Sequence, residues 1–283
     1  MAASDITLNL KKFNITTISS DSVVVFIGKR RTGKSFLIKD LIYYHRHIPI
    51  GTVISGTESA NRFYGDFMPS IFIHDEYQPG IISNVIKRQQ VIKRKFDKDP
   101  NIDPNAFMIL DDCLYDSSWT RDKNVRCLFM NGRHFNILFA IAMQFPLGIP
   151  PNLRTNIDYV FILRENNINN RRRIYENYAS MFPTFEVFCT VMDQCTENHE
   201  CLVLQINSNS NKLEDQVFWY KAQSHEDDDF KIGCKDFWVL SAEKEEEKRR
   251  KQDAEGEMID ISCFRPKKSI PLQVKQCGKV SKQ

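Results

Sequence analysis

The sequence predicts an α/β fold in which a mostly parallel central sheet carries helices on both faces. Short apolar segments that end at polar residues alternate along the chain with segments of helical periodicity. The composition is that of a globular protein, with 42% hydrophobic and 27% charged residues among 283. A chain of this length is sufficient for one α/β domain with extensions.

The expected strands are short and apolar. Residues 23–27 are β-branched or aromatic, which is typical of a strand with both faces buried. Further strands are expected at residues 51–56, 70–75, 106–112, 135–144 and 158–166, with a C-terminal β-hairpin at residues 200–207 and 216–221. Helices are expected at residues 32–45, 81–96 and 169–182.

Composition divides the chain into three regions. Residues 1–20 are expected to form an N-terminal extension or edge strand, and residues 21–240 the α/β domain. The formal net charge is +3, and residues 241–283 carry all of this excess. That segment mixes charges without an apolar stripe, so we expect a flexible tail or a solvated helix. A uniformly basic coat for nucleic acid is excluded, and any such contact must be local.

The segment VVVFIGKRRTGKSFLIK, Val23–Lys39, places a loop rich in glycine and cations between the first buried strand and the first helix. It contains G-x-x-x-x-G-K-S, the phosphate-binding loop (Walker A) pattern, in the strand–helix context that the pattern requires. Lys34 is expected to reach the β- and γ-phosphates, and the Ser35 hydroxyl to bind Mg²⁺. The predicted nucleotide-binding residues are Gly28, Lys29, Arg30, Arg31, Thr32, Gly33, Lys34, Ser35 and Phe36.

Polar side chains end the next two long apolar segments. Asp111 and Asp112 close "FMILDD", where Asp111 is expected to serve Mg²⁺ and Asp112 to polarise an attacking water. Gln144 closes "AIAMQ" and is expected to orient that water and register the γ-phosphate. The alternatives are loop aspartates and a solvated glutamine at a strand end.

Arginine can stabilise the charge of a phosphoryl-transfer transition state, by about 10³–10⁵ in rate when it is supplied as a finger. Arg133 and Arg154 flank the segment that ends at Gln144, and each is equally well explained as a surface or structural residue. In ring ATPases the finger comes from the adjacent subunit, so neither needs to lie in its own site. Arg171–Arg173 is expected to form a solvated helix face or to contact DNA or a subunit.

With the phosphate loop, "FMILDDC", "NGRHFNI", "AMQ" and "LRTNIDYVFILREN" in this order, the chain from Val23 to Phe237 resembles the genome-packaging ATPases of nucleocytoplasmic large DNA viruses. These belong to the FtsK/HerA group of P-loop motors. The resemblance implies a three-layer P-loop NTPase of the ASCE type, with the Gln144 strand between the phosphate-loop strand and the Asp111 strand. Asp112 departs from the wider ASCE group, which usually has a longer Glu there.

The resemblance also implies a function and partners. ATP and Mg²⁺ would be the cofactors of a homomeric ring of about five or six subunits that moves double-stranded DNA into a preformed capsid. A capsid or inner-membrane vertex component would dock the ring in the host cytoplasm, at the viral assembly site, or in the virion. The longest apolar run, Ile137–Met143, is shorter than the roughly 20 residues of a membrane span, so no integral membrane protein is expected.

Basic side chains on the helix expected at residues 81–96 are candidate DNA contacts. They would touch phosphates without reading bases, and a solvated helix face is an equal alternative. The candidates are Lys87, Arg88, Lys93, Arg94 and Lys95.

The eight cysteines show no disulfide framework and are expected to be reduced thiols. Cys189, Cys195, His199 and Cys201 lack the paired spacing of common zinc sites, so ordinary cysteines are expected there.

Two other functions are compatible with the motifs. A P-loop small-molecule or nucleoside kinase would be a monomer unaffected by DNA, with Arg171–Arg173 as a phosphate lid, but it leaves Gln144 and the aspartate pair without clear roles. A nucleotide-gated assembly protein without translocase activity shares every motif, so the sequence does not separate it from a motor.

Overall fold

The computed structural model describes residues 8–113, 117–225 and 228–255. The chain divides into two units, residues 1–241 and residues 242–283. The first unit contains the sheet and the helices that cover it. Helix α8, Lys235–Glu255, begins in the first unit and continues into the second.

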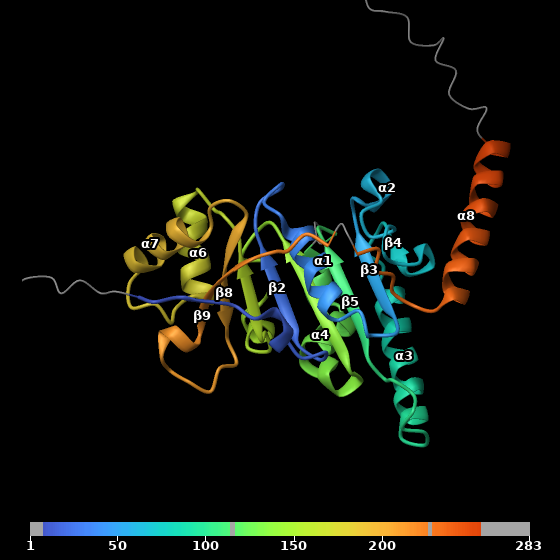
Figure 1. The fold of residues 1–283 in the computed structure, drawn as a ribbon, viewed down its shortest axis with the longest axis horizontal. Coiled ribbons are helices and arrows are strands. Elements are labelled where there is room, and N and C mark those ends of the chain that lie inside the picture. Colours follow the sequence, from blue (N-terminus) through green and yellow to red (C-terminus); the bar gives the residue numbers. More distant parts are fainter. Residues whose placement is uncertain (1–7, 114–116, 226–227, 256–283) are drawn as a thin grey trace, which may run out of the picture. The chain divides into compact units, whose positions relative to one another are not determined.

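One mixed sheet of nine strands runs through the first unit in the order β1-β9-β8-β7-β2-β6-β5-β3-β4 (Figure 1). Neighbouring strands are parallel except where β8 pairs with β7 and with β9. The strands are β1 (Lys11–Lys12), β2 (Val23–Ile27), β3 (Gly51–Ser55), β4 (Ile73–His74), β5 (Ala106–Asp111), β6 (Ile137–Met143), β7 (Tyr159–Ile162), β8 (Glu200–Gln205) and β9 (Val217–Lys221). The predicted mostly parallel sheet and its C-terminal β-hairpin are confirmed.

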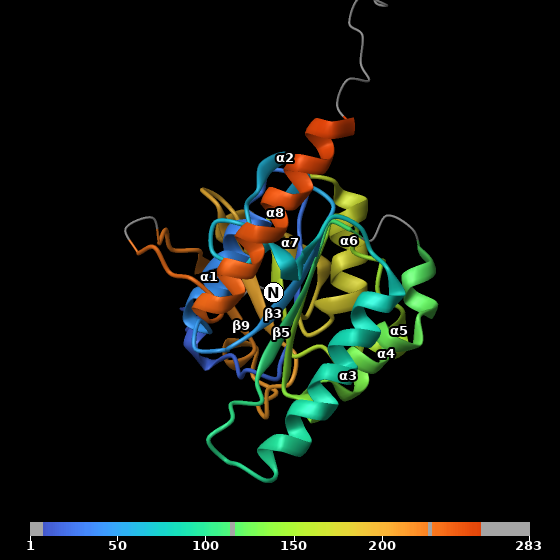
Figure 2. The ribbon, with the colours of Figure 1, turned by 90° about the vertical axis from the view of Figure 1, so that its right-hand side faces the viewer.

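Helices cover both faces of this sheet (Figure 2). The remaining α-helices are α1 (Lys34–Tyr44), α2 (Glu58–Asn61), α3 (Pro79–Phe96), α4 (Lys123–Asn131), α5 (Pro151–Arg154), α6 (Ile168–Tyr178) and α7 (Phe185–Cys195). Helices α3, α4, α6 and α7 contribute apolar side chains to the core on one face, and α1 to the core on the other. The predicted three-layer α/β architecture is therefore confirmed.

Successive side chains of β2 point to opposite faces of the sheet, so this one short strand contributes to both cores. Val23 and Val25 point into the core beneath α3, α4, α6 and α7, while Val24 and Phe26 point into the core beneath α1. All five residues of β2 are buried. A polar substitution on either face of β2 would therefore lie in a core, which is why the run is apolar throughout.

Several elements differ from the sequence prediction for local backbone reasons. Helix α1 begins at Lys34 rather than at residue 32, because Gly33 takes a left-handed φ of +105° as its N-cap. Strand β6 begins at Ile137 because Asn136 is left-handed, with φ +53°. The expected strand at residues 70–75 is reduced to β4, since Ser70–Phe72 form a 3₁₀ turn. Helices α2, α4, α5 and α7 were not predicted.

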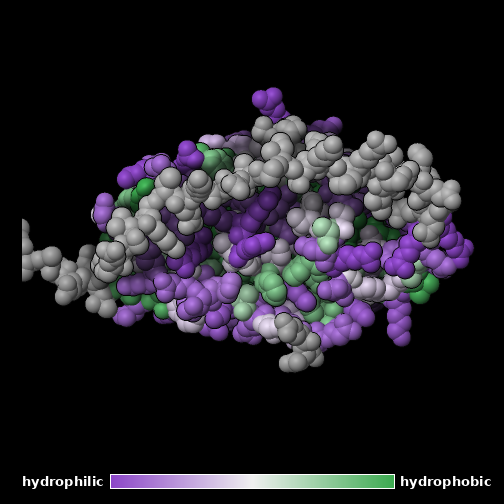
Figure 3. Space-filling model, turned by 90° about the horizontal axis from the view of Figure 1, so that it is seen from above, coloured by the Kyte–Doolittle hydropathy of each residue, from purple (hydrophilic) through white to green (hydrophobic). Residues whose placement is uncertain are grey.

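The strand order brings the phosphate loop, the two aspartates and Gln144 to one edge of the sheet, formed by the carboxyl ends of the strands. Strand β6 pairs in parallel with both β2 and β5, so it separates the phosphate-loop strand from the Asp111 strand, as the resemblance implied. The carboxyl ends of β2, β5 and β6 therefore lie side by side. Figure 3 looks onto this edge, where hydrophilic side chains form much of the visible surface and a smaller group of apolar ones lies among them.

Candidate nucleotide-binding site

The loop between β2 and α1 passes close to its neighbours, and glycine makes this possible. A Cβ on Gly28 would lie 2.6 Å from Thr32 Oγ1 and 2.9 Å from Leu163 Cβ. Gly33 adopts its left-handed φ directly before the first turn of α1. The free amides at the start of α1 therefore adjoin a tight loop, an arrangement that suits an anion.

Lys34 lies inside this loop rather than in solvent. The residue is 5% exposed. Its Nζ donates to the Lys29 carbonyl oxygen at 3.2 Å and lies 3.4 Å from Asp112 Oδ2. The P-loop ammonium group is thus held between the loop and the end of β5, where a terminal phosphate would need a cation.

Ser35 and Asp111 meet as a Mg²⁺ site requires. Asp111 Oδ2 accepts hydrogen bonds from Ser35 Oγ at 3.1 Å and from the Tyr64 hydroxyl at 2.7 Å. Its Oδ1 is buried and has no hydrogen-bond partner among the described residues. Burial raises the pKa of Asp111, against the hydrogen bond from Tyr64, and the charge of Asp112 adds to the rise. An unpaired buried carboxylate oxygen next to a hydroxyl fits a hard cation that prefers oxygen ligands.

Asp112 and Gln144 form the second half of the site. Gln144 Nε2 donates to Asp112 Oδ2 at 3.0 Å. Asp112 has a left-handed φ of +47°, which turns the chain out of β5 directly after Asp111. Adjacent residues thus send one carboxylate towards Ser35 and the other towards Lys34 and Gln144.

Both predicted arginine fingers lie near the amino ends of the parallel strands, whereas the phosphate loop lies at their carboxyl ends. Arg133 precedes β6 and Arg154 precedes β7, and the phosphate loop follows the carboxyl end of the parallel strand β2. Arg133 pairs with Asp158 at 3.5 Å, and Asp158 binds the amide of Val23, the first residue of β2. Neither arginine can therefore contact a nucleotide bound by its own chain.

Arg154 is also engaged locally. Its Nη1 donates to Asn177 Oδ1, and its guanidinium lies 5.7 Å from the Tyr178 ring centroid. By contrast, Arg173 lies 5.1 Å from the ring of Phe145, the residue after Gln144. Arg173 was not assigned to the site from the sequence, because only the packing of α6 brings it near Gln144, at the carboxyl ends of the strands.

Glu165 is a further residue that sequence reasoning missed. It is 4% exposed at the carboxyl end of β7 and binds Lys29 Nζ at 2.6 Å. Burial alone would raise its pKa, but hydrogen bonds from Lys29 and the Asn167 amide outweigh it and lower the pKa. Glu165 thus ties the phosphate loop to β7. The "FILREN" segment gave the only sequence signal.

The candidate DNA-binding residues of α3 are not equivalent. Lys87, Arg94 and Lys95 are exposed. Lys93 donates to the His134 carbonyl oxygen, and Arg88 is half-buried, with Nε and Nη2 buried and unpartnered among the described residues. Of these five candidates, only Lys87, Arg94 and Lys95 are exposed to solvent.

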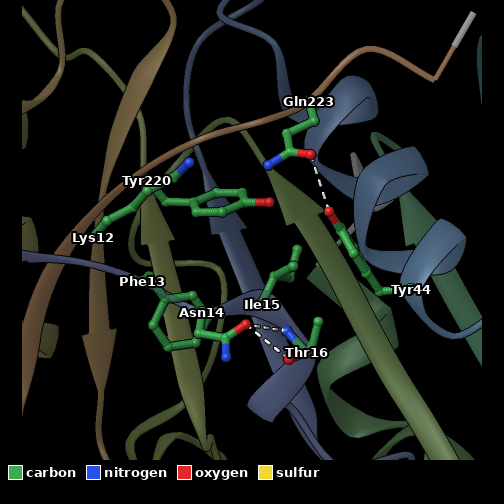
Figure 4. A pocket seen from close by; sticks show the side chains of 8 residues that line it. All are labelled: Lys12, Phe13, Asn14, Ile15, Thr16, Tyr44, Tyr220 and Gln223. Atoms are coloured by element: carbon green, nitrogen blue, oxygen red, sulfur yellow. Dashed lines mark hydrogen bonds between the residues drawn. The ribbon is translucent and has the colours of Figure 1, made fainter.

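Two cavities of the first unit lie away from residues 28–35. One of about 270 Å³ is lined by Lys12, Phe13, Asn14, Ile15, Thr16, Tyr44, Tyr220 and Gln223 (Figure 4). The other, of about 380 Å³, borders α5 and the end of α6 and includes Arg154 and Tyr178. The aromatic and amide lining of the first does not suit a triphosphate.

Within the described residues, no group of three or more His, Cys, Asp or Glu side chains is placed to hold a metal ion. Cys189, Cys195 and Cys201 are free thiols. No described helix is both long enough and apolar enough to cross a membrane.

The sheet order, the glycine-rich loop and the two aspartates define a P-loop NTPase. No model of a known protein family matches the chain. It is 39% identical over 233 residues to a protein of Acanthamoeba polyphaga mimivirus, covering 81% of each. It is also 39% identical over 246 residues to a protein of invertebrate iridescent virus 6, covering 86% of this chain and 93% of the relative. The chain belongs to this family of large DNA virus proteins.

Solved structures show the same fold. The genome packaging NTPase B204 from Sulfolobus turreted icosahedral virus 2, in complex with AMP, matches with a TM-score of 0.53 at 15% identity, covering 73% of this chain and all of that one. The predicted P-loop fold and the predicted kinship with proteins of large DNA viruses are confirmed.

Proposed function

We propose that this protein is an ATP-hydrolysing motor that translocates double-stranded viral DNA into a preformed capsid as a homo-oligomeric ring. The observation that carries the proposal is that two aspartates at the carboxyl end of β5 lie against the phosphate loop. Asp111 lies 3.1 Å from Ser35, and Asp112 lies 3.4 Å from Lys34. Kinship with large DNA virus proteins and the fold shared with a genome packaging NTPase support it.

Each residue of the site has a separate role in the proposed hydrolysis of ATP. The amides of residues 28–35 and Lys34 hold the phosphates. Ser35 and Asp111 would hold Mg²⁺, which neutralises charge on the phosphate oxygens when bound. Asp112 accepts the proton of the attacking water, and Gln144, hydrogen-bonded to Asp112, orients that water.

The ring supplies what a single chain lacks. Arg133 and Arg154 lie far from their own site, so each could act only on a neighbour's nucleotide. The exposed cations of α3 are the proposed contacts with DNA phosphates, and a capsid or inner-membrane vertex component is the proposed dock. The proposed location is the viral assembly site in the host cytoplasm.

The test is the ATPase rate of the purified protein with and without long duplex DNA, together with its mass by light scattering. The proposal predicts an oligomer whose hydrolysis is stimulated by DNA. An oligomer that hydrolyses ATP slowly and ignores DNA would favour a nucleotide-gated assembly protein. A monomer that ignores DNA and phosphorylates a metabolite would favour a kinase.

A further inference from the structure

Tyr64 reaches the metal-binding aspartate from outside the phosphate loop. It lies in the segment between α2 and β4 and is 1% exposed. Its hydroxyl donates to Asp111 Oδ2 at 2.7 Å, a shorter hydrogen bond than the one of 3.1 Å from Ser35 to the same oxygen. Asp111 Oδ1 accepts none from the described residues.

Tyr64 is held in place independently of Asp111. The Glu58 carboxylate, on α2, accepts hydrogen bonds from the amides of Tyr64 at 3.0 Å and Gly65 at 2.8 Å. The Tyr64 ring contacts Phe63 and Phe67 at centroid distances of 5.2 and 5.9 Å. The hydroxyl is therefore fixed by the backbone and the core, and it is Asp111 that is oriented by it.

We propose that Tyr64 is a positioning residue for the metal site: it holds one oxygen of Asp111 and leaves the other free for Mg²⁺. This inference rests on the proposed function. Metal-binding carboxylates are commonly oriented by hydrogen bonds from outer residues, whose loss typically costs about 10–100-fold in metal affinity or activity. A hydroxyl suits this role because it orients the carboxylate without adding a positive charge that would repel the cation.

The test compares Tyr64→Phe with the wild-type full chain. Phenylalanine keeps the ring and its packing and removes only the hydroxyl. The measurement is the affinity for a fluorescent, non-hydrolysable ATP analogue, in EDTA and across a titration with Mg²⁺. We expect metal-free affinity to be unchanged, and the Mg²⁺ concentration for half-maximal enhancement of binding to rise about 10-fold or more.

Tyr220→Phe is the matched control. Tyr220 is also buried, at 2% exposure, and donates its hydroxyl at 2.6 Å to a buried carboxylate, that of Asp40, away from the phosphate loop. Both variants lose one buried hydrogen bond, so a similar fall in melting temperature is expected, but only Tyr64→Phe should change the Mg²⁺ requirement.

An unchanged Mg²⁺ requirement in Tyr64→Phe, with wild-type nucleotide binding, would overturn the inference and leave the proposed function standing. Equal shifts in both variants would also overturn it, since a loss of stability would then explain them. A wild-type protein that binds no nucleotide would instead overturn the proposed function, and the inference with it.

Discussion

Asp112 is proposed to activate water with a side chain one methylene shorter than the usual Glu. The structure compensates through position: Asp112 leaves β5 with a left-handed backbone, so its carboxylate lies 3.4 Å from Lys34 and accepts a hydrogen bond from Gln144. The backbone turn at Asp112, rather than the length of its side chain, thus places the carboxylate beside the phosphate loop.

Asp112→Asn should bind ATP with near wild-type affinity and hydrolyse it about 10²–10⁴ times more slowly, because an amide cannot accept the proton from water. Steady-state turnover beside equilibrium binding of an ATP analogue measures this. Lys34→Ala, which removes the cation that binds the phosphates, is the control expected to lose binding as well. Turnover near the wild-type rate in Asp112→Asn would mean that another group activates the water.

Glu165 provides a pH-dependent contribution to stability. Its pKa is lowered in the fold, so its interactions stabilise the protein above its unfolded pKa of about 4.3 and are lost as pH falls through the lowered value. Glu165→Gln should therefore cost about 1–3 kcal/mol at pH 7 and less in acid. Thermal unfolding at pH 7 and below pH 4 tests this. An equal loss at both pH values would contradict the role of the charge.

Site residues that follow apolar strands were predictable, and those brought in by packing were not. Asp111 and Gln144 end hydrophobic runs, so the parallel sheet places them beside Lys34. Tyr64 lies in a segment without a motif, and Glu165 lies in the "FILREN" segment, which was not assigned to the site. The contacts of both residues depend on how those segments fold against the ends of the strands. The sequence offered no spacing rule that links them to the phosphate loop.

Helix α3 presents its cations unevenly. Its apolar stripe, which includes Ile82 and Val85, packs into the core, as the periodicity predicted. That packing half-buries Arg88. The predicted DNA contacts on this helix therefore reduce to the three exposed cations.

Replacing Lys87, Arg94 and Lys95 with alanine should weaken duplex binding at low salt. The slope of log affinity against log salt should fall by about 0.9 for each DNA phosphate that the variant no longer neutralises. Fluorescence anisotropy with labelled duplex at several salt concentrations measures both effects. The control replaces three exposed lysines at the far side of the sheet from α3: Lys11 on β1, Lys221 on β9, and Lys212 in the segment before β9. Equally weakened binding in both triple variants would show that α3 has no specific role.

Most elements were predicted from their apolar patterns, but helices α4 and α7 were missed although each buries one apolar face, and details set by local backbone geometry were missed as well. Strands β2, β5 and β6 and helices α1 and α3 follow from apolar patterns. By contrast, β4 is shorter than expected because of a 3₁₀ turn, and β6 starts late because Asn136 is left-handed. Such turns depend on single residues whose conformation the periodicity of neighbouring residues does not report.

In the proposed ring, a finger supplied by a neighbouring subunit predicts complementation. Arg133→Ala or Arg154→Ala subunits would keep an intact site but lack the finger, whereas Lys34→Ala subunits would keep the finger but lack a working site. The variant that lacks the finger, and Lys34→Ala, should each be nearly inactive alone, with a loss of about 10³-fold or more for the finger. Mixed rings should regain DNA-stimulated hydrolysis.

Arg133 is the stronger candidate, since its side chain is 53% exposed, whereas Arg154 is bonded to Asn177. The ATPase rate is measured across mixing ratios with each arginine variant in turn. Wild-type rates in an unmixed arginine variant would exclude that residue as the finger. Inactive mixtures for both would exclude complementation by either arginine.

The proposed function depends on a triphosphate that residues 28–35 hold with its terminal phosphorus facing the end of β5. A crystal structure with Mg²⁺ and a non-hydrolysable ATP analogue tests it most directly. We expect the terminal phosphate beside Lys34, with Asp112 and Gln144 around the water position and the metal at Ser35 and Asp111. A nucleotide bound elsewhere on the chain, or one whose terminal phosphate points away from both aspartates, would contradict it.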